Sequence, residues 1–487
     1  QNNMSSFAGN VKEIVHLDFK GAPLKVQYLD QVLESIRQWG ATGVLLEWED
    51  TFPYSGELSI IGSRENCNGD HMYTMDEVYQ ILQAIKSKGL EPIQLVQTIG
   101  HMEFVLKHPT FRELREEPRS PAVLCPTKPK SLQLVKAMIQ NALDAQPDAK
   151  YFHIGADEVW HTAICEDCQR KASVSEYKAT SLFLDHIKDL LIFLKMQRPK
   201  MNILMWDDML RAISFEVLEK SNIGKLVEPV VWNYNVAEHF FVGGELWRNY
   251  RIFPKVWAAS AYKGANGSCQ MVSPVSRYTS NQQAWMREVQ ANADRVNFTG
   301  VILTGWSRFD HYATLCELLP VSLPALNSCL SIWIHPNDSI SLPNWHDTLY
   351  TKRKILKIAL THEVLPENQW AGLAVARSVH SLAALRDRAN QLIHGDAVST
   401  WLNPWQVERG YTCPVQVDGI AATANEILLN LQCLERELSA QLSYITGPRS
   451  ADEWIGSNIT PLVSKVSALH RQAARTATEQ PSVRPVL

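Results

Sequence analysis

The segment Tyr151-Phe-His-Ile-Gly-Ala-Asp-Glu158 begins as a short apolar run and ends in two adjacent carboxylates. A continuous apolar run of this length is typical of a strand that is buried on both faces, as in a parallel sheet. Because ionisable side chains are costly to bury, we expect Asp157 and Glu158 to lie where the strand ends at a cleft. A buried strand that runs directly into polar groups is the unit of an α/β barrel with a site at its mouth.

Runs of the same kind recur on both sides of this segment and alternate with amphipathic stretches of helical spacing. The runs occupy residues 13–19, 43–48, 92–98, 151–155, 202–206, 229–233, 255–259 and 300–304, and the helical stretches include 26–39, 75–87, 132–145 and 177–196. Eight such units predict a (β/α)8 TIM barrel of the α/β class. The alternative is a doubly wound open sheet. No Gly-rich phosphate loop follows the first run, which disfavours the nucleotide-binding form of that fold.

The alternation stops near residue 325. Segments 369–393 and 421–444 have helical spacing without strand-like runs between them. We therefore predict a barrel domain over residues 1–325 and a helical C-terminal region over 326–470. The polar segment 471–487 contains two prolines near its end and is predicted to be a disordered tail.

Bulk composition excludes some classes of protein. Of the 487 residues, 45% are hydrophobic and 20% charged, and the formal net charge of −4 disfavours binding to nucleic acid. No apolar stretch is long enough to cross a membrane. The first ten residues are polar, and the nine cysteines are an odd number scattered along the chain. Free thiols in a reducing compartment fit this pattern better than a disulfide framework. We expect a cytoplasmic or nuclear protein that is not secreted and does not bind membranes.

Polar and aromatic side chains follow the apolar runs, where barrel enzymes place their chemistry. The sequence therefore predicts an enzyme with its site at this end of the barrel. In chain order these side chains are Asp18, Lys20, Glu47, Glu49, Asp50, His101, Glu103, Asp157, Glu158, Trp206, Asp207, Asp208, Trp232, Asn233, Tyr234, Tyr262, Lys263, Trp306, Arg308, Asp310 and His311.

The segment His153-Ile-Gly-Ala-Asp-Glu158 resembles the His-x-Gly-Gly-Asp-Glu signature of family 20 β-N-acetylhexosaminidases, with Ala156 in place of the second glycine. Further segments are similar to the intracellular branch of that family: Val15-His-Leu-Asp-Phe-Lys-Gly-Ala-Pro23, Gly100-His-Met-Glu-Phe104, Met205-Trp-Asp-Asp-Met209, Trp257-Ala-Ala-Ser260 and Thr304-Gly-Trp306. The resemblance implies an exo-acting hydrolase that removes terminal, non-reducing N-acetylgalactosamine or N-acetylglucosamine from a glycan or glycoconjugate. The choice between the two sugars stays open, as does a homo-oligomeric state.

The resemblance also implies a substrate-assisted, retaining mechanism. In it, the 2-acetamido oxygen attacks the anomeric carbon to give an oxazolinium, Glu158 acts as general acid and base, and Asp157 holds the acetamido group. Adjacent residues that leave a strand diverge, so they are poorly placed to act as an opposed acid and nucleophile about 5 Å apart. Two alternatives stay open. One is a retaining glycosidase with a conventional nucleophile such as Glu47 or Asp208, and the other is a barrel that binds a glycan or protein without turnover.

Three tryptophans and one tyrosine are implied for the acetamido pocket. Trp206, Trp232 and Trp306 follow the fifth, sixth and eighth runs, and by resemblance they line the pocket and form the floor under the sugar. Each of them alone could equally be a core residue, because tryptophan is mostly buried. The tyrosine that donates to the acetamido oxygen is either Tyr234 or Tyr262.

The remaining sugar contacts depart from the family pattern. Family members commonly carry an arginine near the end of the first strand, where this chain has Asp18 and Lys20. They also have Trp-x-Glu after the last strand, where this chain has Trp306-Ser-Arg308. Asp310 or Glu103 would then supply the missing carboxylate. Lys20, His101 and Asp208 complete the candidate substrate contacts, although His101 could equally be a hydrogen-bonded core residue.

Cys165 and Cys168 form a Cys-x-x-Cys pair shortly after the carboxylates. Such a pair could bind zinc or act as a redox couple. Zinc needs further ligands, and the sequence contains no second pair. We therefore predict no metal site and no cofactor.

Overall fold

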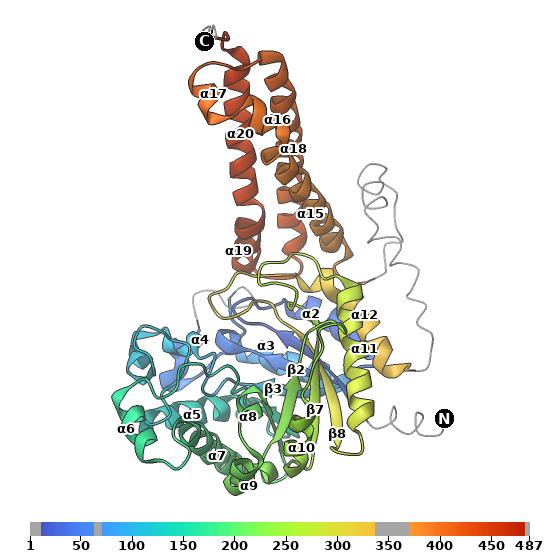
Figure 1. The fold of residues 1–487 in the computed structure, drawn as a ribbon. Helices are drawn as coiled ribbons and strands as arrows, with labels where there is room; N and C mark the ends of the chain where they lie inside the picture. Colours follow the sequence, from blue (N-terminus) through green and yellow to red (C-terminus); the bar gives the residue numbers. More distant parts are fainter. Residues whose placement is uncertain (1–10, 63–70, 337–369, 483–487) are drawn as a thin grey trace. The chain divides into compact units, whose positions relative to one another are not determined.

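The structure, a computed structural model, describes residues 11–62, 71–336 and 370–482. The chain divides into two compact units, residues 1–340 and 341–487. The predicted boundary lay at 325/326. The first unit extends past it because helix α12 (Leu319–Ile334) packs against strand β7 and helix α11 and thereby belongs to the barrel. The second unit is helical (Figure 1).

Eight parallel strands form a closed barrel in the order β1 to β8. The barrel closes because β1 (Lys12–Asp18) pairs with both β2 (Gly43–Glu47) and β8 (Phe298–Gly305). The other strands are β3 (Glu91–Leu95), β4 (Tyr151–His153), β5 (Asn202–Trp206), β6 (Glu228–Trp232) and β7 (Val256–Lys263). The predicted TIM barrel is confirmed, and closure rules out the open sheet.

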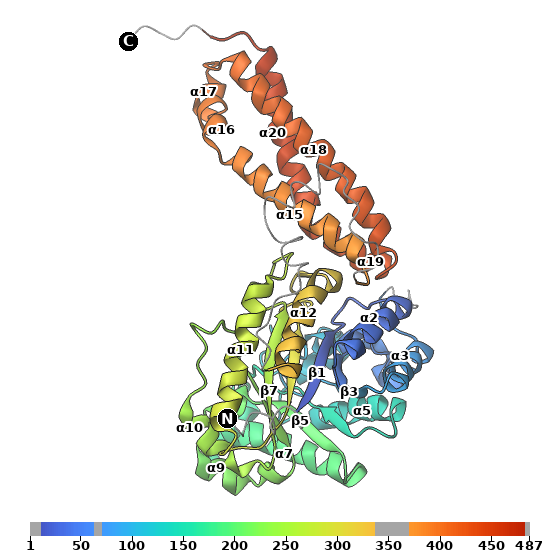
Figure 2. The same cartoon turned by 90° about the vertical axis from the view of Figure 1, so that its right-hand side faces the viewer.

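Helices join the strands and surround the barrel (Figure 2). Helix α3 shows why the sequence folds in this way. Thr74 and Glu77 form a capping box at its N-terminus, and its buried residues recur at helical spacing, so one face packs on the barrel. The helices of the first unit before α12 are α2 (Val26–Gln38), α3 (Met75–Ser87), α4 (Glu103–Leu106), α5 (Pro129–Ala145), α6 (Glu166–Val174), α7 (Ala179–Gln197), α8 (Asp208–Arg211), α9 (Phe215–Ser221), α10 (Gly244–Asn249) and α11 (Val275–Asn292). Short 3-10 helices lie at Glu49–Thr51, Gly56–Ile60, Pro109–Leu114, Ile223–Lys225 and Tyr250–Ile252.

Side chains fill the interior of the barrel. They come from all eight strands: Ile14, Leu45, Ile93, Leu95, Tyr151, Leu204, Trp206, Val230, Trp257, Ala259 and Ile302. Trp232 and Trp306 pack on this cluster while staying partly exposed. The core therefore continues into an aromatic layer at the mouth of the barrel, where the strands end.

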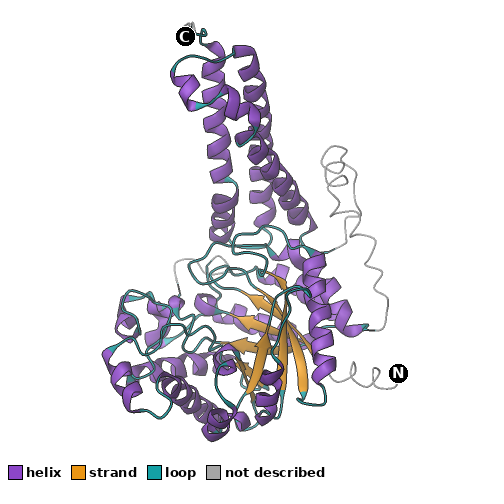
Figure 3. Ribbon diagram, viewed as in Figure 1, coloured by secondary structure: helices purple, strands orange, loops and turns teal. Residues whose placement is uncertain are grey.

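The second unit consists of α15 (Leu373–Ile393), α16 (Asp396–Trp401), α17 (Pro404–Glu408), α18 (Pro414–Leu442), α19 (Pro448–Asn458) and α20 (Thr460–Thr478). In Figure 3 the strands all belong to the first unit, within the described part of the chain. The prediction of disorder from residue 471 is wrong up to Thr478. Leu469, Ala473 and Thr476 are buried at helical spacing, so α20 continues along α18 despite its polar composition. Residues 483–487 lie outside the described residues. None of the helices in the described ranges has the length and apolarity that crossing a membrane requires.

Candidate active site

A cavity of about 420 Å³ opens at the carboxyl ends of the strands. Its lining contains eight of the residues predicted for the site: Lys20, His101, Asp157, Glu158, Trp206, Trp232, Tyr234 and Trp306. Four other predicted residues, Glu103, Asp208, Tyr262 and Asp310, are not among the lining residues. The cavity is therefore the candidate active site, and its two walls differ in chemistry.

The polar wall begins with a tight turn after β4. Gly155, Ala156 and Glu158 all have positive φ angles, of 62°, 69° and 50°. At Gly155 a side chain is excluded, because a Cβ would lie 2.0 Å from Oε1 of Gln97. The amide of Gln97 fixes the turn, since its Oε1 accepts from the backbone N–H of Ala156 at 3.2 Å and its Nε2 donates to Oδ1 of Asp157 at 3.0 Å. Such backbone strain persists only where the surroundings impose it.

His101 joins the two carboxylates. Its Nε2 lies 3.3 Å from Oδ2 of Asp157 and 3.2 Å from Oε2 of Glu158. Burial disfavours the imidazolium, but the two carboxylates outweigh burial and raise the pKa of His101 well above its usual range. Burial likewise opposes the charge of Asp157, and the positive charge of His101 with the Gln97 hydrogen bond still lowers the pKa of Asp157. At neutral pH, His101 and Asp157 are therefore both charged.

Asp208 accepts hydrogen bonds from both Glu158 and Trp232. Its Oδ2 accepts from the backbone N–H of Glu158 at 2.8 Å, and its Oδ1 accepts from the indole N–H of Trp232 at 3.2 Å. Burial and the nearby charge of Asp157 raise the pKa of Asp208 to about 7. Because both of its oxygens are engaged, Asp208 is placed to hold Glu158 and Trp232 in position.

Lys20 and Glu47 form the base of the polar wall. The Nζ of Lys20 lies 3.6 Å from Asp18, 3.7 Å from Glu47 and 4.0 Å from Glu49. These carboxylates outweigh burial and raise the pKa of Lys20. Oε2 of Glu47 lies 2.9 Å from Nε2 of His16, while its Oε1 is buried without a hydrogen bond. Glu47 thus lines the cavity with Oε2 held by His16 and with the ammonium of Lys20 beside its Oε1.

A second part of the lining, called the aromatic wall here, consists of Trp206, Trp232, Tyr234 and Trp306. Tyr234 stacks on Trp232, with ring centroids 5.3 Å apart and an interplanar angle of 22°. The ring centroid of Trp306 lies 6.5 Å from that of Tyr234 and 5.9 Å from that of Trp206. The indole nitrogen of Trp206 is buried without a hydrogen-bond partner. This wall suits the flat faces and methyl groups of a sugar derivative.

Tyr262 does not reach the cavity. The predicted seventh run ended at residue 259, but β7 extends to Lys263, so Tyr262 lies within the strand. Its hydroxyl donates to the carbonyl of His16 at 2.9 Å, and Gly305 leaves room for its ring, which would lie 2.3 Å from a Cβ there. Of the two tyrosine candidates, the structure brings only Tyr234 to the pocket.

Glu103 and Asp310 also lie apart from the lining residues. Glu103 is buried at the start of α4, and burial raises its pKa. Asp310 accepts from the backbone N–H groups of Tyr312 and Ala313 at 2.8 Å and 3.0 Å, so it stabilises a turn. The contact that was predicted for one of these carboxylates has no support from their positions.

Several lining residues were not foreseen as site residues: Gln97, Gly264, Ala265, Gly267, Ser268, Phe309 and Cys316. Gln97 lies inside the third apolar run, which also contains the polar residues Gln94 and Thr98, so the sequence did not single it out. The small residues of 264–268 follow the seventh strand and form part of the rim. Their composition resembled an ordinary turn, so the sequence did not mark them as part of a site.

Comparisons with known proteins agree with this geometry. A family model described as a domain of unknown function, DUF4838, matches residues 22–212. "Hexosaminidase D" of Homo sapiens is 36% identical over 464 residues, which cover 94% of this chain and 93% of that protein. "Hexosaminidase D" of Bos taurus is 40% identical over 324 residues, covering 66% of this chain and 92% of that protein. The human alignment is too long to be confined to the barrel, so the helical unit belongs to the resemblance as well.

Among solved structures, a catalytic module of the pneumococcal exo-β-D-N-acetylglucosaminidase StrH has a TM-score of 0.50 and 14% identity, covering 78% of this chain and 92% of that chain. A likeness at this level of identity supports the barrel fold alone. The two curated relatives carry the assignment, because the chain covers more than nine tenths of each of them. The chain belongs to the hexosaminidase D family and is a glycoside hydrolase.

Proposed function

We propose that this chain is an exo-acting β-N-acetylhexosaminidase of the family 20 type, which hydrolyses terminal N-acetylgalactosamine or N-acetylglucosamine with the help of the substrate's own acetamido group. One observation carries the proposal. Asp157 and Glu158 both contact His101, and all three line a cavity whose other lining residues include Trp206, Trp232, Tyr234 and Trp306. Two carboxylates that contact the same imidazole nitrogen suit one acid and one group that orients a nucleophile from the sugar.

The proposed reaction assigns one role to each carboxylate. Asp157 accepts the acetamido N–H while the acetamido oxygen attacks the anomeric carbon. Glu158 gives its proton to the leaving glycosidic oxygen, so the glycosidic bond breaks as the oxazolinium ring forms. Glu158 then takes a proton from water, the water oxygen attacks the anomeric carbon, and the ring reopens with net retention.

The other lining residues receive supporting roles. Tyr234 is proposed to donate its hydroxyl to the acetamido oxygen. Trp206, Trp232 and Trp306 are proposed to enclose the acetamido methyl group and to support the sugar ring. Glu47 and Lys20 form the polar base and are proposed to bind sugar hydroxyls, where related enzymes use arginine. The volume of the cavity suits a small-molecule site, for which about 300–1,000 Å³ is usual.

The decisive experiment compares two substrates with the same aryl leaving group, a β-galactoside and its 2-acetamido counterpart. An intramolecular nucleophile supplies on the order of 7–11 kcal/mol, so we expect negligible turnover of the plain galactoside. A thiazoline-fused sugar, which mimics the bicyclic intermediate, should bind far more tightly than the substrate. Comparable turnover of the two glycosides would reject the mechanism.

The same experiment separates the rival functions. A conventional nucleophile such as Glu47 would hydrolyse both glycosides, because it needs no acetamido group. Glu47 is the stronger rival of the two named candidates, since it lines the cavity and Asp208 does not. A barrel that only binds glycan would release no aryl alcohol from either substrate while still binding the N-acetylated one.

A cytoplasmic or nuclear location is part of the proposal. It is supported by the eight described cysteines, all of which are free thiols. Mass spectrometry of protein taken from its own cells, alkylated before lysis, should find these thiols reduced. A native disulfide or secreted protein would contradict the location without affecting the proposed chemistry.

A further inference from the structure

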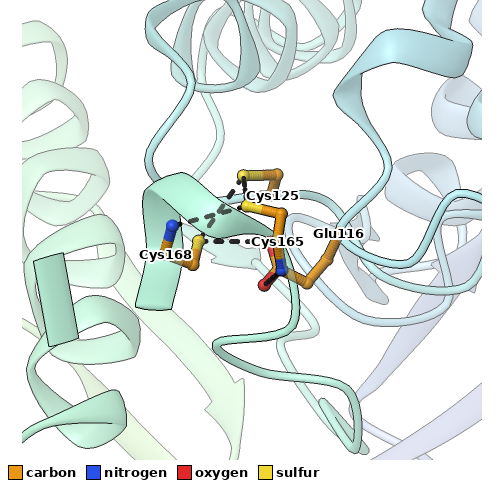
Figure 4. A group of neighbouring side chains, drawn as sticks. All are labelled: Glu116, Cys125, Cys165 and Cys168. Atoms are coloured by element: carbon orange, nitrogen blue, oxygen red, sulfur yellow. Dashed lines mark hydrogen bonds between the residues drawn. The ribbon is translucent and has the colours of Figure 1, made fainter. Parts of the chain in front are cut away.

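Three cysteines and one glutamate gather outside the active-site cavity (Figure 4). Glu116 and Cys125 lie between the 3-10 helix Pro109–Leu114 and α5, on a hairpin closed by a bridge between Arg115 and Leu124. Cys165 caps the N-terminus of α6, and Cys168 lies in its first turn. One ligand atom from each residue can be chosen so that all four lie within 4.8 Å of one another.

The sulfur spacing is that of a metal site. Sγ of Cys125 lies 3.6 Å from Sγ of Cys165 and 3.5 Å from Sγ of Cys168. A disulfide would bring two sulfurs to about 2.05 Å. Thiolates at a tetrahedral zinc ion, with Zn–S bonds of about 2.3 Å, lie about 3.8 Å apart. The observed separations are close to that second value.

Glu116 is placed to supply the fourth ligand. Its side chain is buried, and its Oε2 lies 3.1 Å from Sγ of Cys168. Its Oε1 accepts from the backbone N–H groups of Ile164 at 2.6 Å and Cys165 at 3.1 Å. One oxygen is thus fixed by the Cys-x-x-Cys turn while the other faces the sulfurs, the arrangement that orients a carboxylate ligand.

The surroundings also suit a structural ion. Donors to the sulfurs are present, since the backbone N–H of Cys168 donates to Sγ of Cys165 at 3.4 Å and the Thr127 hydroxyl lies 3.2 Å from Sγ of Cys125. Cys125 and Cys168 are buried and pack with Ala172 and Leu182 in an apolar cluster. Cys165 is partly exposed. Four protein ligands would leave no coordination position for a substrate, which is typical of structural rather than catalytic zinc.

We propose that Glu116, Cys125, Cys165 and Cys168 bind one Zn²⁺ ion in tetrahedral geometry. Each thiol gives up its proton to the solvent when its Zn–S bond forms. The ion would join the segment that follows β3 to the segment that follows β4. Those two segments also carry His101 and the Asp157–Glu158 pair, so the site is placed to hold the two parts of the polar wall together.

A second acidic group gives a useful contrast. Glu49, Asp50 and His311 also lie close together. There, however, Nζ of Lys107 lies 2.9 Å from Nε2 of His311 and 3.8 Å from Oδ2 of Asp50. The ammonium group of Lys107 therefore already supplies positive charge to this cluster. That arrangement explains its charges without a metal ion.

The test is the metal content of the full chain, purified under reductant and without chelator. Elemental analysis should find about one zinc ion per chain. Cys125→Ser and Cys168→Ser should lose it. Cys269→Ser removes an exposed thiol and Cys329→Ser a buried thiol, both outside the cluster, and both should keep zinc. Glu116→Gln keeps an acceptor for the backbone amides but removes the anionic ligand, so it should release zinc at a lower chelator concentration.

A second measurement does not depend on whether the cysteine variants fold. Wild-type protein stripped of zinc and loaded with Co²⁺ should show the thiolate-to-metal and ligand-field absorption of tetrahedral cobalt, and zinc should displace it. Chelation should also lower the Tm of the wild type but not that of Cys125→Ser. Wild-type protein that contains no zinc and gives no cobalt spectrum would overturn the proposal, as would a disulfide among these cysteines in the native protein. None of these readouts depends on glycosidase activity.

Discussion

The backbone N–H of Glu158 donates to Oδ2 of Asp208 at 2.8 Å, and this bond links the turn after β4 to the start of α8. Glu158 has a φ angle of 50°, which is uncommon for a residue with a side chain. The hydrogen bond helps to offset the cost of that conformation. Since Asp208 also binds the indole of Trp232, one buried carboxylate aligns the proposed acid with the aromatic wall.

Glu158→Gln tests the general acid. With a poorly activated leaving group we expect kcat/KM to fall about 10²–10⁴-fold, the usual contribution of a positioned acid or base. An activated aryl leaving group needs little protonation. The variant's rate of the glycosylation step should therefore fall less on an activated aryl substrate than on a poorly activated one. Rates measured on both substrates check this. Equal rates for variant and wild type on both substrates would remove Glu158 from the mechanism.

Asp157→Asn tests the group that orients the nucleophile. The substitution keeps the shape of the side chain but removes the charge that stabilises the developing oxazolinium. We expect kcat to fall even on the activated aryl substrate, because the nucleophile rather than the acid is impaired. The ratio of losses between the two leaving groups therefore distinguishes Asp157 from Glu158. A variant that loses activity only on the poor leaving group would contradict the assignment.

His101→Gln tests the charge coupling of the polar wall. The positive charge of His101 helps to lower the pKa of Asp157 against burial, so removing that charge should raise it. Asp157 would then be protonated at higher pH, and the acidic limb of the kcat/KM profile should move toward neutral pH. In the wild type, the stabilisation from charged Asp157 is lost as pH falls through its lowered pKa. An acidic limb at an unchanged pH would show that Asp157 does not control it.

Tyr234→Phe and Tyr262→Phe form a matched pair. Each variant removes one hydroxyl, but only Tyr234 lines the cavity. We expect Tyr234→Phe to lower kcat on N-acetylated substrates by roughly 10²-fold, as for the loss of one donor to a developing charge. Tyr262→Phe should instead lower the Tm, because it removes a buried hydrogen bond to the His16 carbonyl. Kinetics and thermal unfolding of both variants check this. A fall in kcat for Tyr262→Phe, with only a lower Tm for Tyr234→Phe, would contradict the proposed role of Tyr234.

The sequence by itself determined the barrel and pointed to Asp157 and Glu158 as the proposed catalytic pair. Apolar runs and helical spacing are local patterns, since each depends only on residues within a single strand or a single helix. Strand β5 (Asn202–Trp206) and helix α3 (Met75–Ser87) therefore have the predicted bounds. The sequence could propose the pair Asp157–Glu158 because its motif is contiguous along the chain.

Only the tertiary structure decided which distant residues meet. The choice of Tyr234 over Tyr262 depended on how far β7 extends, because side chains alternate in direction along a strand. Cys125 precedes Cys165 by 40 residues, and the loops that follow β3 and β4 bring their sulfurs together. Distances across a barrel are fixed by its closure and by the packing of its loops. No local pattern contains that information, so the sequence showed a Cys-x-x-Cys pair where the structure brings Glu116, Cys125, Cys165 and Cys168 together.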